Sequence, residues 1–519
     1  MNFVNPVADT PYLLGIDIGT YSSKGVLVNE SGEVVASWTV EHPLETLHPG
    51  WAEHDAETTW WHDFLEISRS LLLLSGISPR QIAAIGFSAI SPAVLPLDRD
   101  GRPLRKAILY GIDTRATREV TELQQVIDRD PLLSARGVRL SSQAASPKVL
   151  WIRRHEPEIW AQTHLVVNGS GFLLYRLTGQ ATLDVYDAVT YAPFVDFERC
   201  AWTPALQEHV APIAKFPRLT WTCDIAGTIS AEGARQSGLA EGTPIITGTA
   251  DAAAEAISAG LANVGDLMVM YGSSIFFILR TPRFYITPSF WAAHFLEEGT
   301  YVLTGGMSTS GSLTKWFRDG FAPLEVEAEK GGGENAYAAL ARLAATSPQG
   351  ANGLVVLPYF SGERTPLLDP DAKGMIFGLG LHHKRADVYR AMLESVGFGI
   401  RHNIDVMKEQ GAEPKRILAV GGGTHNPLWM QIVSDIAGIE QHIPAQQIGA
   451  SYGDAFLAGV GVRLFSGTVE ASRWVKTGQV VRPEPTAHRR YEDHYRLYRE
   501  LYTRTAPLMR QTSGLQRGG

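Results

Sequence analysis

The sequence contains one short arrangement twice: a strand, a turn of glycine and hydroxyl residues, and a second strand. In the first copy the turn is Gly19-Thr20-Tyr21-Ser22-Ser23, between apolar runs at 12–18 and 24–29. In the second copy the turn is Gly272-Ser273-Ser274, between runs at 267–271 and 275–279. Gly19 and Gly272 lie 253 residues apart, about half of the 519-residue chain. A single repeat at this period indicates a duplicated domain and argues against a solenoid.

The segments around these turns predict an α/β protein. Strands are expected at 34–40, 82–88 and 93–97, and a helix at 55–74, where Trp60, Phe64, Ile67 and Leu71 follow helical spacing. Further helices are expected at 252–258, 387–408 and 488–505, and we expect the tail at 511–519 to be disordered. Strands alternate with helices, and the length suits about two domains.

Composition excludes several classes of protein. The chain has 46 Lys+Arg and 54 Asp+Glu, a net charge of -8, and no long basic block, so nucleic acid and membrane surfaces are poor partners. Two cysteines, Cys200 and Cys223, cannot form a disulfide framework or a thiolate metal site. No apolar run is long enough to span a membrane, and the N-terminus lacks the pattern of a signal peptide. We therefore expect a cytoplasmic protein.

The first turn has the residues of a magnesium–nucleotide site. Asp17 ends a buried strand, and a carboxylate there can hold Mg²⁺ directly or through water. The turn N–H groups and the hydroxyls of Thr20, Ser22 and Ser23 can bind phosphate oxygens, with Lys24 adding a positive charge. It is not a Walker A loop, because the glycine–lysine spacing is absent and a strand follows. The alternative is a tight hairpin with no ligand.

Asp251 lies where the strand 244–247 passes into a helix, in Gly248-Thr249-Ala250-Asp251. A carboxylate held rigidly there suits a general base at the mouth of a cleft. The alternative is an aspartate that only caps the helix.

A third glycine-rich turn follows the strand near residue 418. Gly421, Gly422 and Gly423 precede Asn426 and a helix from about Leu428, so a flat ligand or its phosphates could approach the backbone. A dinucleotide fingerprint fails, since Asn426 stands where its last glycine is required.

The segment Ser361-Gly362-Glu363-Arg364-Thr365-Pro366 predicts an ordered, functional loop, because two charges lie beside Gly and Pro in an apolar context. The alternative is a surface ion pair between Glu363 and Arg364.

Together, in this order, these motifs resemble the FGGY family of carbohydrate kinases, and within it the xylulokinases. Five further segments are similar to the family: HPGWAE at 48–53, the Trp60-Trp61 pair, AILYGIDTR at 107–115, KVLW at 148–151 and GMIFGLGLHHKRADVYRAMLE at 374–394. The residues before Lys148 depart from one signature. The similarity runs from about residue 12 to 462.

The resemblance implies an actin-like ATPase fold: two duplicated, ribonuclease H-like domains with an interdomain cleft, at residues 1–260 and 261–519. It implies ATP-dependent phosphorylation of the terminal primary hydroxyl of a small sugar, with Mg²⁺ as cofactor near Asp17 and Asp251 as the catalytic base. Gly19, Thr20, Ser22, Ser23 and Lys24, then Gly272, Ser273 and Ser274, then Gly421, Gly422, Gly423 and Asn426 would bind the nucleotide. Ser91, Pro92, Asp113, Arg115, Asp251 and Ala252 would bind the sugar.

Two positions depart from the xylulokinase pattern. Ser91 and Pro92 stand where xylulokinases carry a Gln-Met-His-Gly segment, and Ala252 stands where they typically have Asn. A sugar pocket discriminates through its paired polar groups, so other ketoses, deoxy-sugars and polyols stay open beside D-xylulose. An actin-like ATPase without sugar kinase activity, a binding protein that keeps the fold, and the oligomeric state, a homodimer included, also stay open.

Overall fold

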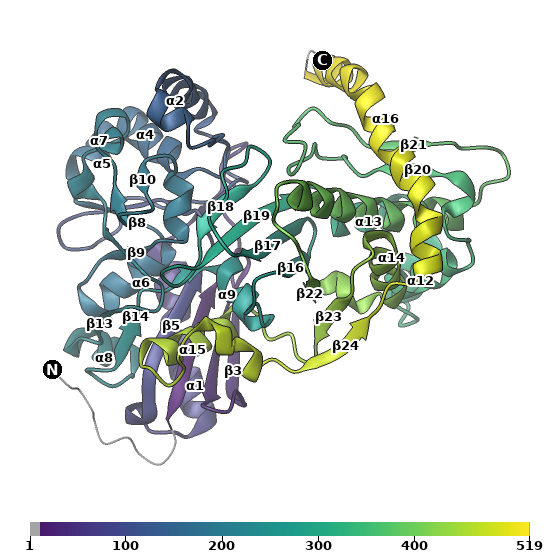
Figure 1. The fold of residues 1–519 in the computed structure, drawn as a ribbon. Helices are drawn as coiled ribbons and strands as arrows, with labels where there is room; N and C mark the ends of the chain where they lie inside the picture. The colour runs from purple at the N-terminus through teal and green to yellow at the C-terminus, as the bar shows by residue number, and fades with distance from the viewer. Residues whose placement is uncertain (1–10, 518–519) are drawn as a thin grey trace.

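The computed structural model describes residues 11–517 and has two lobes, the first half of the chain in one and most of the second half in the other (Figure 1). The first lobe is built on a seven-stranded sheet in the order β13-β14-β5-β1-β2-β3, with β15 also paired to β5. Its strands are β1 (Tyr12–Ile18), β2 (Ser22–Asn29), β3 (Val34–Glu41), β5 (Ile82–Ala89), β13 (Ile225–Thr228), β14 (Pro244–Ile246) and β15 (Thr249–Ala250). The predicted three-strand meander at the start of the chain is confirmed.

The second lobe repeats this plan in the order β18-β19-β17-β16-β22-β23-β24. Its strands are β16 (Asp266–Tyr271), β17 (Ile275–Thr281), β18 (Trp291–His294), β19 (Tyr301–Met307), β22 (Arg416–Val420), β23 (Gln441–Pro444) and β24 (Thr477–Val481). In both sheets an antiparallel hairpin is followed on one side by two parallel neighbours and a final antiparallel strand. The duplication predicted from the two glycine turns is therefore present in the topology.

Two helices join the lobes. Helix α9 (Asp251–Ser258) follows β15, and α15 (Ala450–Gly461), far along the chain, packs on β1, β5 and α9 of the first lobe (Figure 1). Gly15 and Gly86 permit this packing, because a Cβ at either position would lie 1.9 Å or 2.2 Å from a backbone oxygen of α15. One hydrophobic cluster accordingly contains residues of both sheets and both helices, among them Leu13, Ile257, Leu418 and Phe456.

The first lobe carries an inserted α/β region with its own core, including Val94, Leu123, Val149 and Phe194. Its helices are α2 (Thr117–Arg129), α3 (Pro131–Ser134), α4 (Ala145–His155), α5 (Pro157–Gln162) and α7 (Pro204–His209); α1 (His62–Ser75), α6 (Gly169–Thr178) and α8 (Ala231–Ser237) cover the main sheet. The second lobe adds α10 (Gly311–Phe321), α11 (Pro323–Lys330), α12 (Ala336–Ala345), α13 (Arg385–Glu409), α14 (Pro427–Ala437) and α16 (Pro485–Arg517).

The helices predicted near 55–74, 252–258 and 387–408 are confirmed within a few residues, although the first opens with a π-helical segment at Ala56–Trp61. The helix predicted at 488–505 is confirmed but is longer, Pro485–Arg517. The prediction of a disordered tail is wrong for residues 511–517, which continue α16. Met509 and Ser513 are buried there, and the Ser513 hydroxyl donates to the Asp371 carbonyl, so the last turns have a surface to pack on. The expectation about a signal peptide falls mainly on residues 1–10, which lie outside the described residues.

Candidate active site

Carboxyl side chains from three elements converge where β1 ends. Asp17 is the last but one residue of β1, and the pairing of Thr249 and Ala250 with the end of β5 brings Asp251 beside it. Glu255 lies one turn further along α9, and Asp454 reaches the same point from α15. We call Asp17, Asp251, Glu255 and Asp454 the carboxylate cluster.

Ser88 connects two members of this cluster. Its Oγ lies 2.9 Å from Oδ1 of Asp17 and 2.7 Å from Oδ2 of Asp454. A serine hydroxyl has one hydrogen, so it can donate to only one of these carboxyl groups. Asp454 is fully buried, and burial raises its pKa well above the usual range. Burial thus favours the protonated form of Asp454, and in that form its carboxyl group can donate to Ser88 while Ser88 donates to Asp17.

Burial and mutual repulsion raise the pKa of every member of the cluster. Burial is the larger cause for Asp251, whose pKa rises to about 8, with repulsion from Asp17 second. The pKa of Asp17 rises to about 7 through burial and repulsion from Glu255, against the hydrogen bond from Ser88. Lys24 lies opposite Asp17 on β2, and its charge lowers the pKa of Asp17 and of Glu255. Its ammonium donates to the Ile448 carbonyl, so it also ties the two halves together.

The oxygen donors of this cluster fit a magnesium ion, which Asp17 would hold. Its ligands are carboxylate oxygens, which Mg²⁺ prefers, and a cation would offset their repulsion. Within residues 11–517 no three His, Cys, Asp or Glu side chains are close enough to hold a metal ion alone. An ion beside Asp17 would therefore take its other ligands from water and substrate.

The turn of the first hairpin, Gly19 to Ser23, is partly exposed and is held in place by hydrogen bonds. Gly19 donates its N–H to the Ser22 carbonyl at 3.0 Å, and the Thr20 hydroxyl lies 3.2 Å from that of Tyr110. Ser22 is half-buried, but Ser23 is fully buried and donates to Asp63 at 2.6 Å. The Ser23 hydroxyl therefore cannot serve as the predicted phosphate ligand in this conformation; the strand alternation turns it into the core.

The turn of the second hairpin, Gly272 to Ser274, lies against the start of α10. Gly311 donates its N–H to the Gly272 carbonyl, and Ser312 donates both its N–H and its hydroxyl to the Ser273 carbonyl. The helix N-terminus thus adds positive dipole charge beside this hairpin. Sequence reasoning missed this element, although Ser310-Gly311-Ser312 between an apolar strand and a helix was a usable signal.

The third glycine turn joins the second hairpin directly. Gly421 has a φ of +92°, and a Cβ there would lie 2.8 Å from the Tyr271 carbonyl oxygen, so glycine is required. Gly422 is exposed and Gly423 half-buried, which leaves backbone open to a ligand. Asn426 caps α14 by accepting the Trp429 N–H at 3.1 Å. The structure therefore brings Gly421, Gly422 and Gly423 beside Gly272.

The predicted sugar residues divide into two groups. Ser91 donates to Asp187, which also accepts a hydrogen bond from Asn168, and the charge of Asp187 raises the pKa of Asp251. These side chains lie on the Asp251 side of the cleft, where Pro92 is buried and Ala252 half-buried. Asp187 was not foreseen, because nothing in the sequence links it to Ser91, 96 residues away.

Asp113 and Arg115 form the other group, a buried ion pair. The Arg115 guanidinium donates to Asp113 and to Glu53 and lies 3.8 Å from the centre of the Trp51 ring. Its side chain is only 1% exposed. The charged groups of Asp113, Arg115 and Glu53 already form hydrogen bonds with one another inside the first lobe, so a sugar would reach them only after a rearrangement.

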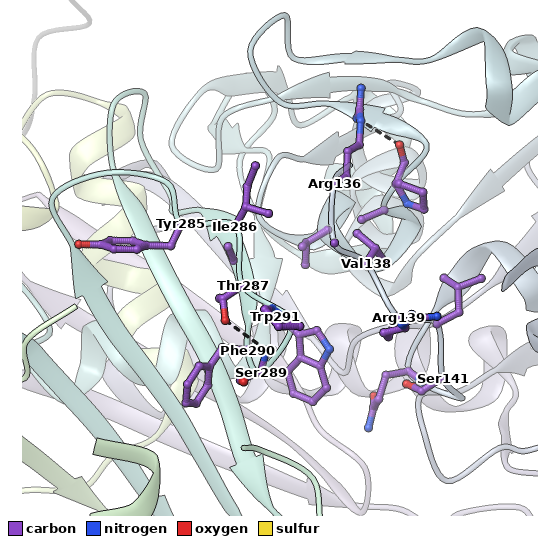
Figure 2. Close-up of a pocket in the computed structure, with 18 of the residues that line it drawn as sticks. Arg136, Val138, Arg139, Ser141, Tyr285, Ile286, Thr287, Ser289, Phe290 and Trp291 are labelled. Carbon is purple, nitrogen blue, oxygen red and sulfur yellow. Dashed lines mark hydrogen bonds between the residues drawn. The ribbon is translucent and has the colours of Figure 1, made fainter. Parts of the chain in front are cut away.

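A cavity of about 1880 Å³ opens between the lobes. The segment from Arg136 to Ser141 faces the segment from Tyr285 to Trp291 across it (Figure 2). Ser274 of the second hairpin and Arg364 also line it, as does Tyr110, whose hydroxyl lies 3.2 Å from that of Thr20 in the first hairpin. The alternative of a surface ion pair between Glu363 and Arg364 is excluded, because Glu363 is buried and accepts the N–H groups of Ser308 and Arg364.

Asp251 did not prove to be a simple helix cap. The residue before α9 is Ala250, and the Asp251 carboxylate accepts only the neighbouring Ala252 N–H at 2.7 Å. Its half-buried position beside Asp17 leaves it available for chemistry.

Two lobes with the same sheet topology, each built on a glycine hairpin, define the actin-like fold class. The chain belongs to the FGGY family of carbohydrate kinases: the model of the family's N-terminal domain matches residues 12–258 and that of its C-terminal domain matches residues 267–462. It is thus a carbohydrate kinase, an enzyme that takes ATP as phosphoryl donor and a small sugar as acceptor.

The similarity to relatives of the family extends over most of the chain. The xylulose kinase of Escherichia coli is 30% identical over 96% of this chain and 99% of its own. The crystal structure of xylulose kinase from Rhodospirillum rubrum superposes with a TM-score of 0.89 and 32% identity, covering 96% of this chain and 99% of that one. The gluconokinase of Bacillus subtilis is 27% identical over 86% of this chain and 87% of its own. None of the helices in the described part of the chain is both long and apolar enough to cross a membrane.

Proposed function

We propose that this enzyme transfers the γ-phosphoryl group of ATP to the terminal primary hydroxyl of a pentulose such as D-xylulose, giving the 5-phosphate and ADP. The observation that carries the proposal is the position of Asp251, half-buried beside Asp17, which precedes the first glycine turn and lies opposite Lys24. We further propose that residues 1–260 supply the sugar side and Asp251, that residues 261–519 supply the adenosine side, and that the enzyme is cytoplasmic.

Asp251 acts as the general base in this mechanism. It accepts the proton of the sugar hydroxyl as that oxygen attacks the γ-phosphorus in line, so the residues mainly position groups and balance charge. Asp17, held by Ser88, is the residue that would hold Mg²⁺. When bound, Mg²⁺ supplies positive charge that neutralises phosphate oxygens and favours ionised carboxylates.

The two turns and Gly421 to Gly423 act on the nucleotide. Backbone N–H groups of Gly19, Thr20 and Ser22 on one lobe, and of Gly272, Ser273 and Ser274 on the other, would donate to phosphate oxygens. Gly421, Gly422, Gly423 and Asn426 would border the adenosine. Closure of the lobes around the cavity would exclude water and limit ATP hydrolysis.

A second candidate is a kinase for a different sugar. Ser91, Pro92 and Ala252 favour it, because the ring donor and the amide expected in a xylulokinase pocket are absent. The pairing of Ser91 with Asp187 gives the pocket a different set of polar groups. Gluconokinase among the relatives shows that this scaffold is used for other acceptors.

A coupled ADP-release assay over ketoses, aldoses, sugar acids and polyols tests both candidates. We expect release to depend strongly on one class of acceptor, with D-xylulose or another pentulose first. Equal release with every compound and with none would favour an actin-like ATPase without sugar kinase activity. The Asp251→Asn variant serves as the blank, because it should bind ATP without transfer.

A further inference from the structure

Arg364 is a mostly enclosed cation that forms no salt bridge within residues 11–517, and the charge of Glu363 is the one that acts on it there. The Arg364 side chain lies between the loop 361–366 and the second sheet. Its neighbour Glu363 uses one oxygen on two backbone N–H groups, and burial raises the pKa of this carboxyl group to about 7. A guanidinium is always charged, and burying such a charge without an anion is costly.

The guanidinium is fixed beside the second hairpin. Its Nη2 donates to the carbonyl of Ile275 at 3.0 Å and to that of Met307 at 2.7 Å. These two residues face each other where β17 and β19 pair, and Ile275 directly follows the turn Gly272-Ser273-Ser274. Gly306 makes room for the group, because a Cβ there would lie 3.2 Å from the Arg364 Cζ. The side chain is therefore held rigidly at the hairpin.

The rest of the guanidinium faces the cleft. Nε and Nη1 have no partner in the described structure, and neither is among its buried, unpartnered side-chain atoms. Arg364 lines the cavity between the lobes together with Ser274 and Ser308. The Nε and Nη1 groups of the rigid Arg364 guanidinium can thus donate hydrogen bonds to a ligand at the second hairpin.

Other cations near the cleft are already occupied. Lys24 donates to Ile448, and Arg136 donates to the carbonyls of Pro193 and Val195. Arg139 is paired with Asp128 on the surface. Arg364 is thus the cation best placed to balance charge on the second-lobe side of the cleft.

We propose that Arg364 binds the terminal phosphoryl group of the nucleotide at the second hairpin, an assignment that rests on the proposed kinase function. A guanidinium fork matches two phosphoryl oxygens, and the charge on these oxygens is what a kinase must stabilise during transfer. The assignment is to the γ-phosphoryl group, so ADP, which lacks this group, would lose no contact when Arg364 is replaced. The loop from Ser361 to Pro366 is then the element that carries this ligand to the hairpin.

Nucleotide titrations test this assignment without knowledge of the sugar. Binding of Mg–ADP and of an ATP analogue with an imido β,γ-bridge is measured by isothermal titration calorimetry for the wild type, Arg364→Gln and Arg364→Lys. We expect Arg364→Gln to weaken the analogue about 10–100-fold, as for loss of a charge-assisted hydrogen-bond pair, and to leave ADP within about twofold. Arg364→Lys keeps the charge but loses the fork, so its loss should be intermediate.

Arg342→Gln is the matched control, because Arg342 lies on α12 of the same lobe with an exposed side chain paired to Glu334. Equal losses for ADP and analogue, or no loss for either, would overturn the assignment. An Arg364→Gln defect that appears only with acidic sugars would overturn it too, since the guanidinium would then bind the acceptor's carboxylate. A wild type that binds neither nucleotide would instead refute the proposed function, before Arg364 is considered.

Discussion

Replacing Asp251 by Asn should lower the turnover and raise the stability of the protein. The two side chains have the same size, and the amide oxygen can still accept the Ala252 N–H. The substitution removes one charge from the carboxylate cluster, in which burial and Asp17 raise the pKa of Asp251 to about 8. Folding therefore disfavours the ionised form of Asp251, which the proposed mechanism requires.

The size of the stabilisation follows from linkage. The pKa of Asp251 rises from 3.8 to about 8, and each unit corresponds to about 1.4 kcal/mol, which sets an upper limit of about 6 kcal/mol. Asp251 is half-buried, and Asp17 shares the repulsion, so we expect about 1–3 kcal/mol. The pKa of Asp251 is higher in the folded than in the unfolded protein, so ionised Asp251 destabilises the fold. This destabilisation is absent below about pH 4 and grows until about pH 8.

Thermal unfolding without nucleotide or Mg²⁺ measures this effect. At about pH 8.5 the Asn variant should melt about 2–12 °C above the wild type, taking about 2–4 °C per kcal/mol for a unit of this size. The destabilisation by ionised Asp251 begins near the unfolded pKa of 3.8 and is complete near the folded pKa of about 8. At about pH 5 the difference in melting temperature should therefore be roughly three tenths of its value at about pH 8.5. Asp100→Asn, on an exposed turn, is the control and should shift neither curve.

Turnover is measured in parallel by sugar-dependent ADP release. Loss of the base should lower kcat about 10²–10⁴-fold while nucleotide binding is kept. An Asn variant that melts at or below the wild-type temperature at high pH would refute the account of the cluster. A stability difference that does not depend on pH would also refute the account of the carboxylate cluster. Near-wild-type turnover of the Asn variant would show that Asp251 is not the general base.

Four other substitutions give separate outcomes. Gly86→Ala should cost about 1–3 kcal/mol in denaturant unfolding, because its methyl group meets the backbone of α15; unchanged stability would contradict the close packing. Ser23→Ala should cost about 1–3 kcal/mol, since Asp63 loses a buried donor, and should leave the KM for ATP unchanged; a raised KM would restore Ser23 as a phosphate ligand. Arg115→Gln should cost about 3–5 kcal/mol in the same measurement, and wild-type stability would speak against a buried pair. Asp454→Asn should keep near-wild-type kcat, because an amide can donate to Ser88, whereas an equal loss in Asp454→Asn and Asp454→Ala would mean that the charge matters.

The order of strands in the two sheets could be predicted in part from the sequence, because each hairpin is formed by residues that are close together in the chain. Each hairpin consists of neighbouring strands with a glycine turn, so its two copies are visible without any contact information. The position of Asp251 after a short strand likewise predicted a carboxylate at a sheet edge. The resemblance to a family then gave these local features their relative arrangement.

The contacts that complete the site could not be predicted in this way. Ser88 and Asp454 are 366 residues apart, and no periodicity links them. Ser23 looked like Ser22 in a turn of hydroxyls, but β2 begins at Ser22, and strand alternation buries the next side chain. Asp113 and Arg115 were assigned to sugar by family likeness, whereas burial and the neighbours Glu53 and Trp51 were invisible in the sequence.

The path of α15 changes how the two halves of the chain should be understood. This helix belongs to the second half, yet it covers β1 and β5, fills the space opposite Gly15 and Gly86, and brings Asp454 to Ser88, which also contacts Asp17. A fragment ending near residue 260 would lose that cover and expose apolar side chains of the first sheet, such as Leu13. The two sheets are repeats in topology, but the first lobe is complete only with a helix from the second half. Any closing motion must therefore leave α15 attached to the first sheet, and the hinge must lie in the segments that join α9 and α15 to the second sheet.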